Sequence, residues 1–489
     1  MNSALVIIFL VAAMALVLGV ASRYGKEMTL EQWTVGGRGF GGLFVFLLTA
    51  GEIYTTFTFL GGSGFAYGKG AAAYYILGYG ALAYVISYWL LPPIWRYARR
   101  ESLVSQPHYF SRRYESPFLG VLVALVGVIA LVPYLVLQLK GLGIIVSVAS
   151  YGDISSTTAV WIGATIVTIY VMVSGVHASA WTSAVKDFLI LAIVIFLGIY
   201  LPFHYYGGFG EMFRAIEAAK PGFLTLKPAG DGSLLWFQST VLLTALGFYM
   251  WPHQFGALMT ARAERSFRIN ATILPLYQLI LLFVFFCGFA AILKVPGLTG
   301  ADIDLSLFRL SIQTFDPWFV GVIGAAGVLT ALVPGSMILI AAATLLANDV
   351  YRGLLPETAD ATVARMARGL VPVIALVAVY FTLQGGQTIV ALLLMGYSFV
   401  TQMFPAVIAS LMQNNPMTKQ GAFAGILVGA ATVVGVTITH STIGTLAPFL
   451  PSRFDEINVG FVALILNAIV AVVVSLATRP APAPSARSA

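Results

Sequence analysis

The sequence predicts an all-α protein that crosses a membrane many times. Of its 489 residues, 59% are hydrophobic and only 9% are charged, whereas an ordinary soluble domain carries roughly 25% charged residues. Apolar segments of about 20 residues, long enough to span a hydrocarbon core about 30 Å thick, recur from residue 3 to residue 477. The fold class is therefore that of a polytopic membrane protein.

Charged residues and turns delimit thirteen predicted transmembrane helices. They cover residues 3–21, 41–66, 71–95, 118–149, 156–175, 181–204, 233–258, 270–294, 316–347, 367–384, 387–413, 419–439 and 457–477. Residues 1–478 then form a single transmembrane domain, because the longest polar loops are too short to fold alone. The Pro- and Ala-rich residues 479–489 are expected to form a disordered tail.

The positive charges predict how the chain lies in the bilayer. Its 26 Lys and Arg gather mostly in alternate loops, such as residues 96–113 and 262–268. Loops rich in Lys and Arg stay in the cytoplasm, so we expect the N-terminus outside and the C-terminus inside the inner (plasma) membrane. This placement explains the net charge of +7 without nucleic-acid binding. A lone cysteine, Cys287, excludes a disulfide framework or a cysteine metal site, and no metal or cofactor is expected.

Three predicted spans contain residues that interrupt helices: Gly51 in 41–66, Pro252 in 233–258 and Pro334 in 316–347. Backbone that leaves a helix inside hydrocarbon must be buried in protein or line a cavity. The interruptions fall at corresponding positions of two five-helix halves, about 41–204 and 233–413, and such pairing indicates the central site of a transporter. Each break alone also fits a plain kink or close packing.

Several segments resemble the sodium:solute symporter family: AGEIYTTFT, VPYLVLQLKGLG, SAWTSAVKD, MWPHQFGALMTA and ANDVY. The combination of VPYLVLQL, VKD, WPH and ALVP is most similar to bacterial monocarboxylate permeases, which take up small acids such as lactate, pyruvate or acetate. The resemblance implies a leucine-transporter-type inverted repeat of five plus five helices, with one extra N-terminal and two extra C-terminal helices. It also implies symport by alternating access.

Ionisable residues within spans are candidates for coupling, because each costs at least about 2.5–3.5 kcal/mol in a bilayer. Glu52 lies at the first interruption, where the resemblance implies the neighbourhood of a sodium site; a structural acid paired with another helix is the alternative. Lys186 and Asp187 lie in 181–204. Consecutive helical residues point about 100° apart, so we do not expect these two to face each other as a pair. An interfacial pair that snorkels to water is the alternative.

The expected sodium site departs from the family pattern. In sodium-coupled members, two adjacent hydroxyl residues lie fifteen and sixteen positions before the aspartate of a D-[IVL]-Y motif. The resemblance places Pro334 and Val333 there, counted from Asp349 of ANDVY. Neither side chain offers an oxygen, whereas a hard cation needs several. The degenerate sodium site consists of Ala50, Ile53, Val333, Pro334 and Ser336.

We therefore expect coupling to H⁺, or no ion coupling, rather than coupling to Na⁺. In the H⁺-coupled case the Lys186 ammonium takes the place of a sodium ion, with Glu52 as its partner. Backbone carbonyls near Pro334 could still build an altered sodium site, so Na⁺ stays open. The predicted span 181–204, the fifth helix of the first half, also departs from the family pattern. The resemblance implies an acid after the Trp-Thr pair, and Ser183 stands there instead.

Polar side chains near the interruptions are candidates for substrate binding: Tyr54, Thr55, Thr58, Gln138, Tyr249, Trp251 and Gln254. A substrate carboxylate would meet N–H groups at the start of a half-helix, where the partial positive charge favours anions. Lys140 could attract that carboxylate or snorkel outward. His253 could carry protons or only donate a structural hydrogen bond.

The sequence thus predicts a symporter of a small organic monocarboxylate in a lipid bilayer, with no particular oligomeric state predicted. A channel would need a repeated filter loop or rings of like charge, and the sequence shows neither. An intramembrane enzyme would need a nucleophile with a base, or a metal motif such as H-E-x-x-H; no such motif occurs in a suitable setting, so we expect no enzyme. The alternative within transporters is a sodium-coupled symporter of proline-like amino acids or other polar solutes.

Overall fold

The computed structural model describes residues 3–22, 24, 29–51, 53–230, 232–446, 448–449 and 451–479. Within these residues the regular structure is helical, with two isolated β-bridges, Phe40–Ala261 and Lys227–Ser233. Several helices begin where a Ser or Thr oxygen accepts an otherwise unsatisfied N–H of the first turn. These capping residues are Ser105, Ser116, Ser155, Ser233, Thr388 and Thr418. The predicted tail beyond residue 479 lies outside the described residues.

The α-helices in chain order are α1 (Ser3–Ser22), α2 (Leu30–Val35), α3 (Gly42–Gly51), α4 (Ser63–Lys69), α5 (Tyr75–Arg100), α6 (Gln106–Arg113), α7 (Pro117–Ala149), α8 (Ser156–Tyr206), α9 (Phe209–Ala219), α10 (Leu234–Gly247), α11 (Pro252–Met259), α12 (Arg265–Leu279), α13 (Leu281–Ala291), α14 (Ser306–Thr314), α15 (Pro317–Thr344), α16 (Arg352–Leu354), α17 (Asp360–Gln384), α18 (Ile389–Val400), α19 (Phe404–Leu411), α20 (Lys419–Thr439), α21 (Ile443–Leu446) and α22 (Val459–Thr478). Short π-helical or 3-10 turns are η1 (Gly36–Arg38), η2 (Phe57–Gly62), η3 (Gly70–Tyr74), η4 (Phe248–Met250), η5 (Gly300–Leu305), η6 (Leu345–Tyr351), η7 (Thr401–Met403) and η8 (Ser452–Glu456).

Ten helices of the described chain are long and apolar enough to span a membrane, or eleven if the bent pair Leu234–Met250 and Pro252–Met259 counts as one span. The predicted number of thirteen separate helices is not confirmed. Helix α8 runs for 51 residues and contains two predicted spans, 156–175 and 181–204. The chain turns between them at one residue, Gly175, whose φ of 57° suits a residue without a Cβ. Residues 57–100 likewise join the end of one predicted span to the next.

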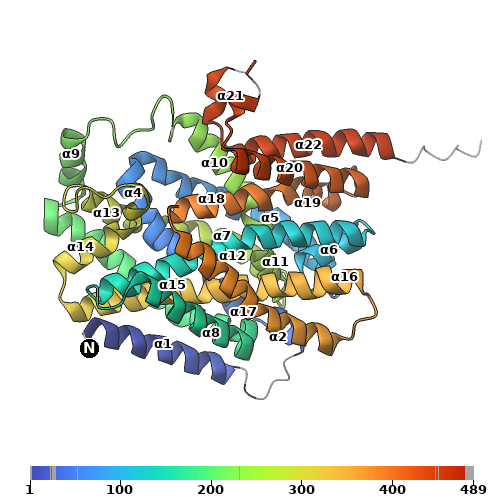
Figure 1. The fold of residues 1–489 in the computed structure, drawn as a ribbon, viewed down its shortest axis with the longest axis horizontal. Coiled ribbons are helices and arrows are strands. Elements are labelled where there is room, and N and C mark those ends of the chain that lie inside the picture. Colours follow the sequence, from blue (N-terminus) through green and yellow to red (C-terminus); the bar gives the residue numbers. More distant parts are fainter. Residues whose placement is uncertain are drawn as a thin grey trace, which may run out of the picture.

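Helix α15 forms the centre of the bundle. The most apolar stretch of residues 317–354 is completely buried, and α15 packs against α1, α7 and α8. In Figure 1, α1 runs along the lower edge beside α8 and α15, whereas α20 and α22 pack together along the upper edge. The first helix and the last two are therefore peripheral, and the chain between them builds the core.

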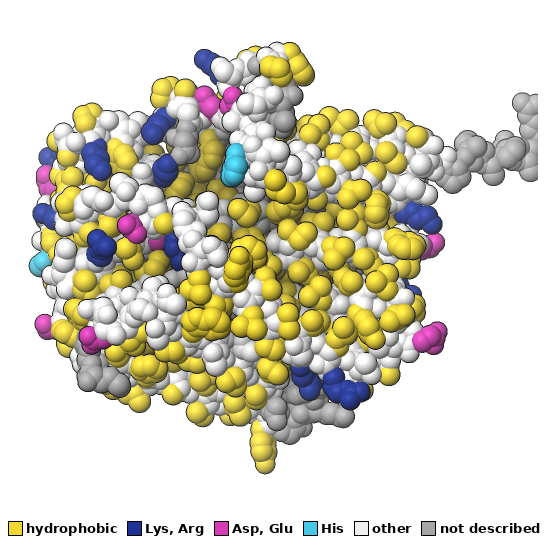
Figure 2. All heavy atoms as spheres, viewed as in Figure 1, with side chains coloured by type: hydrophobic (Ala, Val, Ile, Leu, Met, Phe, Trp, Pro, Cys, Tyr) yellow, Lys and Arg dark blue, Asp and Glu magenta, His cyan; other side chains and the backbone are white. Residues whose placement is uncertain are grey.

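The outer surface is apolar, as expected for contact with lipid. Figure 2 shows hydrophobic side chains over the flank formed by α7, α17, α20 and α22, with charged side chains mainly toward the left and right ends of the view. Large apolar side chains such as Phe118, Phe188 and Leu276 are 74%, 79% and 67% exposed. Soluble monomers rarely expose extended apolar surfaces of this kind. The protein is a multi-pass membrane protein.

Candidate functional site

The first predicted interruption is confirmed as a break in the helix. Helix α3 ends at Gly51 and helical structure resumes after a turn, in η2. The turn is held by side chains, because the Thr55 N–H donates to Thr58 Oγ1 (3.0 Å) and the Phe57 N–H donates to Thr55 Oγ1 (3.1 Å). The Thr55 N–H is thereby diverted from the carbonyl of Gly51 four residues earlier. Two predicted substrate-binding residues, Thr55 and Thr58, thus cap the second segment.

Lys186 of α8 fills this break with its ammonium group. The side chain is 0% exposed, and its Nζ donates to the carbonyl oxygens of Gly51 and Tyr54, the latter at 3.1 Å. The same atom lies 3.1 Å from Oδ1 of Asp187. The ammonium therefore donates two hydrogen bonds to backbone carbonyls and lies at ion-pair distance from a carboxylate. A buried cation is tolerated because it is both paired and hydrogen-bonded.

The prediction that Lys186 and Asp187 would not face each other is wrong. The long, flexible lysine side chain curves back to the neighbouring carboxylate, although the two Cα–Cβ bonds diverge along the helix. The alternative of an interfacial pair also fails, since Lys186 is 0% and Asp187 only 4% exposed. The third predicted coupling residue, Glu52, lies outside the described residues.

The residues of the predicted degenerate sodium site are buried around the same place. Ala50, Ile53, Val333 and Ser336 are 0–3% exposed. Ser336 Oγ donates to the Val333 carbonyl (2.6 Å) and shares a hydrogen bond with Ser179 Oγ (2.7 Å). The carbonyl of Ala50 accepts the Ile53 N–H at 2.8 Å. The Ser336 hydroxyl and the carbonyls of Val333 and Ala50 therefore already take part in hydrogen bonds within the protein.

The predicted interruption at Pro334 is wrong. Helix α15 continues through Pro334 and Gly335 as one element. A proline removes one backbone hydrogen bond from a helix interior, but tight packing on all sides, with α7 and α8 among the neighbours, holds the remaining turns in place. Of the three predicted interruptions, those at Gly51 and Pro252 are therefore breaks and the one at Pro334 is not.

The second confirmed break separates α10 from α11. Trp251 is extended, with φ −63° and ψ 130°, and Pro252 begins α11, so that the two helical parts meet at 46°. Proline suits this first helical position because it has no N–H to satisfy. The side chain of Gln106 donates from Nε2 to the carbonyl of Met250 at 2.8 Å.

Aromatic rings surround the second break. The Trp251 ring lies 4.8 Å from that of Tyr134 and 5.2 Å from that of Tyr397, measured between ring centroids. His253 is also buried, with its ring 5.2 Å from Tyr134. The ring of Tyr249 lies 4.9 Å from that of the adjacent Phe248. The predicted substrate residues Tyr249 and Trp251 therefore have different aromatic neighbours at the break.

The other predicted substrate residues are buried near the two breaks. Gln138 of α7 accepts a hydrogen bond at Oε1 from the hydroxyl of Thr56, while its Nε2 is buried without a partner among the described residues. Gln254 on α11 is 4% exposed. Thr56 was missed because nothing in the sequence distinguishes it from Thr55 and Thr58.

Two tyrosines, Tyr84 and Tyr277, lie between the two breaks and were not predicted from the sequence. Tyr277 of α12 lies edge-on to Tyr54, with 5.2 Å between ring centroids. Tyr84 of α5 is close enough to Tyr54, Tyr249 and Tyr277 for electrostatic interaction. Both lie in apolar helices, where a tyrosine usually indicates only a core position.

Lys140 neither reaches the breaks nor snorkels outward. Its Nζ lies 2.6 Å from Oδ2 of Asp304 and donates to the Gln387 carbonyl at 2.7 Å. The same carboxylate oxygen accepts the Ile389 N–H at 2.9 Å. Burial raises the pKa of the Asp304 carboxyl, and the Lys140 ammonium opposes this rise. The ion pair thus ties α7 to η5 and to the start of α18.

Breaking this ion pair from one side should destabilise the protein more than removing both charges. Lys140→Met leaves the fully buried Asp304 carboxylate without its ammonium, and losing one partner of a buried pair costs about 3–5 kcal/mol. Thermal melting of the purified protein should therefore drop further for Lys140→Met than for Lys140→Met combined with Asp304→Asn. Equal melting temperatures would show that the two charges are not coupled.

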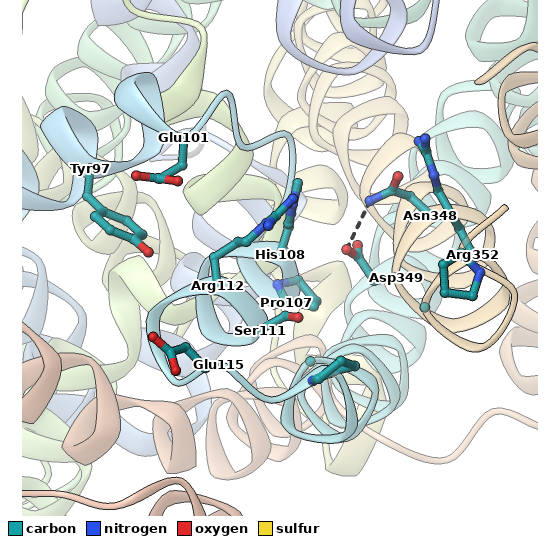
Figure 3. Close-up of a pocket in the computed structure, with 14 residues that line it drawn as sticks. Tyr97, Glu101, Pro107, His108, Ser111, Arg112, Glu115, Asn348, Asp349 and Arg352 are labelled. Atoms are coloured by element: carbon teal, nitrogen blue, oxygen red, sulfur yellow. Dashed lines mark hydrogen bonds between the residues drawn. The ribbon is translucent and has the colours of Figure 1, made fainter. Parts of the chain in front are cut away.

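A polar vestibule of about 870 Å³ opens at the end of the bundle where α6 faces η6 and α16. Figure 3 shows His108 and Arg112 on one side and Asn348, Asp349 and Arg352 on the other. Asp349 of the ANDVY segment accepts hydrogen bonds from Ser105 Oγ (2.7 Å) and Asn348 Nδ2 (3.0 Å). Because Ser105 caps α6, this carboxylate fastens α6 to η6.

His108 is uncharged in the vestibule at neutral pH. Burial lowers the pKa of its imidazole to about 4, and the nearby Arg112 adds to the effect. The backbone N–H of His108 donates to Ser105 Oγ at 3.1 Å. The vestibule therefore offers arginine cations but no histidine cation at neutral pH.

Known proteins resemble the chain along most of its length. Residues 33–429 match the model of the sodium:solute symporter family. The chain is 63% identical, over all of both sequences, to a Bacillus subtilis (strain 168) protein described as uncharacterized symporter YhjB. It is 30% identical to a monocarboxylate transport permease protein of Rhizobium johnstonii, covering 95% of this chain and 94% of the relative.

A sodium/proline symporter of Salmonella typhimurium is 26% identical over 67% of this chain and 66% of that protein. Among solved structures, a Na⁺-coupled sialic acid symporter in a substrate-bound, outward-open state superposes with a TM-score of 0.77. That match covers 98% of this chain and 99% of the other, at 14% identity. At this identity the similarity establishes a shared fold.

Proposed function

The chain belongs to the sodium:solute symporter family, and from this premise we propose that it takes up a small organic monocarboxylate by H⁺-coupled symport. The observation that carries the proposal is the Lys186 ammonium in the first helix break, bound to the carbonyls of Gly51 and Tyr54. The resemblance to sodium-coupled members implies that a sodium ion would take its ligands near this break. A fixed cation repels a second cation at the same place.

In a sodium-coupled symporter the site binds and releases Na⁺ during the cycle, and a lysine at that site can bind and release a proton instead. In the proposed cycle, Lys186 releases its proton when the surrounding helices rearrange and draw the Gly51 and Tyr54 carbonyls away from it. Deprotonation removes the charge-assisted hydrogen bonds that hold Gly51 and Tyr54. The break is then free to change its angle, and alternating access follows from this movement. Glu52 is the proposed partner that receives or supplies the proton.

The substrate class rests on the relatives and on the size of the site. One relative at 30% identity is a monocarboxylate transport permease protein. The rings of Tyr134, Trp251 and Tyr397 pack closely around the second break, which favours a small substrate. Tyr54, Gln138, Tyr249 and Gln254 are the proposed polar contacts, and the α11 N-terminus beside Trp251 offers partial positive charge to a carboxylate.

The repeat architecture and orientation complete the proposal. Residues 41–204 and 233–413 form the two inverted halves, each with its first helix broken, at Gly51 and Pro252. The end of the bundle that holds the vestibule carries the Arg-rich residues 96–113, so in this proposal it faces the cytoplasm and the N-terminus lies outside. Substrate released from the breaks then passes through the vestibule, whose lining includes the arginines Arg112 and Arg352 and the acids Glu101, Glu115 and Asp349.

Uptake by the purified protein in proteoliposomes tests the function. We expect labelled lactate, pyruvate or acetate to accumulate under an inward pH gradient, without dependence on sodium, and Glu52→Gln to lose this accumulation. Accumulation that requires a sodium gradient would contradict proton coupling. Sodium-driven uptake of proline, with none of the acids, would support the amino-acid symporter instead.

A further inference from the structure

Three buried tyrosine hydroxyls between the Lys186–Asp187 pair and the second break have no hydrogen-bond partner among the described residues: those of Tyr54, Tyr84 and Tyr277. They come from the first break, from α5 and from α12. The side chains are 0%, 0% and 8% exposed. Buried polar groups almost always have a partner, so several unpartnered hydroxyls in one place require an explanation.

The three hydroxyls form one cluster that begins at Asp187. Tyr54 and Tyr277 both lie within electrostatic range of the Asp187 carboxylate. The rings of Tyr54 and Tyr277 lie 5.2 Å apart, and the ring of Tyr84 lies 5.3 Å from that of Phe248, the neighbour of Tyr249 at the second break. Packing of α12 against α3 and α5 brings these residues together. The cluster therefore extends from the Lys186–Asp187 pair to the edge of the proposed substrate site.

We propose that Tyr54, Tyr84 and Tyr277 hold internal water and relay protons between the Lys186–Asp187 pair and the second helix break. This inference rests on the proton-coupled transport proposed above. A buried water needs two to four polar partners, and the three hydroxyls supply them.

The relay is balanced at each step. A hydroxyl oxygen accepts a proton from the oxygen behind it and gives its own proton to the oxygen ahead, so one O–H bond forms as another breaks. Each group regains its starting charge after the proton has passed. At the ends of the relay, Lys186 or Asp187 exchanges the proton on one side and water near Tyr249 exchanges it on the other. No tyrosine has to ionise permanently.

Tyrosine-to-phenylalanine substitutions test the relay, because they remove only the hydroxyl. Tyr75 is the matched control: its hydroxyl is equally buried and unpartnered, but it lies nine residues before Tyr84, about 13 Å away along α5. Its ring neighbours are Phe65, Tyr79 and Trp236. If removing a buried hydroxyl slowed uptake only by disturbing the structure, Tyr75→Phe would slow uptake as well.

We expect Tyr84→Phe and Tyr277→Phe to slow uptake driven by a pH gradient by about tenfold or more, while counterflow exchange of labelled substrate without a gradient stays at the wild-type rate. Tyr75→Phe should match the wild type in both assays. Wild-type rates for all three variants would overturn the relay, and so would an equal loss of uptake and counterflow. If uptake by the wild-type protein did not depend on the pH gradient, the proposed function itself would be contradicted.

Discussion

Replacing Lys186 by methionine is expected to abolish uptake driven by a pH gradient while substrate counterflow persists. Methionine matches much of the length of the lysine side chain but carries no proton, so the carbonyls of Gly51 and Tyr54 lose their charged donor. Transport can then no longer draw energy from proton movement. Uptake and counterflow in proteoliposomes measure the two activities separately, and pH-driven uptake by Lys186→Met would refute the role of this ammonium.

The variant will also be less stable, which calls for controls. Removing the ammonium from a buried ion pair costs about 3–5 kcal/mol. Lys186→Met combined with Asp187→Asn should recover part of that stability without recovering coupling. Lys140→Met is the matched variant elsewhere, since it removes an ammonium from the Asp304 pair, away from the breaks. It should lower the melting temperature but leave uptake dependent on the pH gradient.

Replacing Gly175 by alanine is expected to lower the free energy of unfolding by about 2–6 kcal/mol, with backbone strain and overpacking each contributing about 1–3 kcal/mol. Gly175 has φ 57° within α8, a conformation that residues with a side chain rarely adopt. A Cβ at this position would also lie 2.6 Å from the Trp33 carbonyl oxygen. Trp33 cannot easily move, because its Nε1 donates to the Val171 carbonyl at 3.1 Å.

Thermal melting in detergent, followed by tryptophan fluorescence, measures this effect. Gly369→Ala is the control, since a Cβ at Gly369 on α17 would meet no atom within 4 Å. Alanine favours a helix over glycine by up to about 1 kcal/mol, so this variant should melt at or slightly above the wild-type temperature. Equal melting of Gly175→Ala and wild type would show that α8 can turn without a glycine.

The apolar character of the chain and two of its breaks were predictable from local sequence. Long apolar runs demand lipid or burial, whatever the tertiary arrangement. Glycine at residue 51 and proline at residue 252 alter the backbone itself, and the structure confirms both breaks. Pro334 shows the limit of this logic, because a proline disrupts a helix only as far as the surrounding packing allows, and α15 is buried on all sides.

Only the tertiary structure determined which buried charges and hydroxyls lie next to one another. Lys186 was a candidate from its charge alone, but its carbonyl acceptors come from a residue 135 positions earlier and one 132 positions earlier. Lys140 pairs with Asp304, which lies 164 positions later in the sequence. Tyr84 and Tyr277 became candidates only once α12 was seen packed against α5. Local sequence governs helix formation and burial, whereas the partner of a buried charge or hydroxyl depends on how helices distant in the chain pack together.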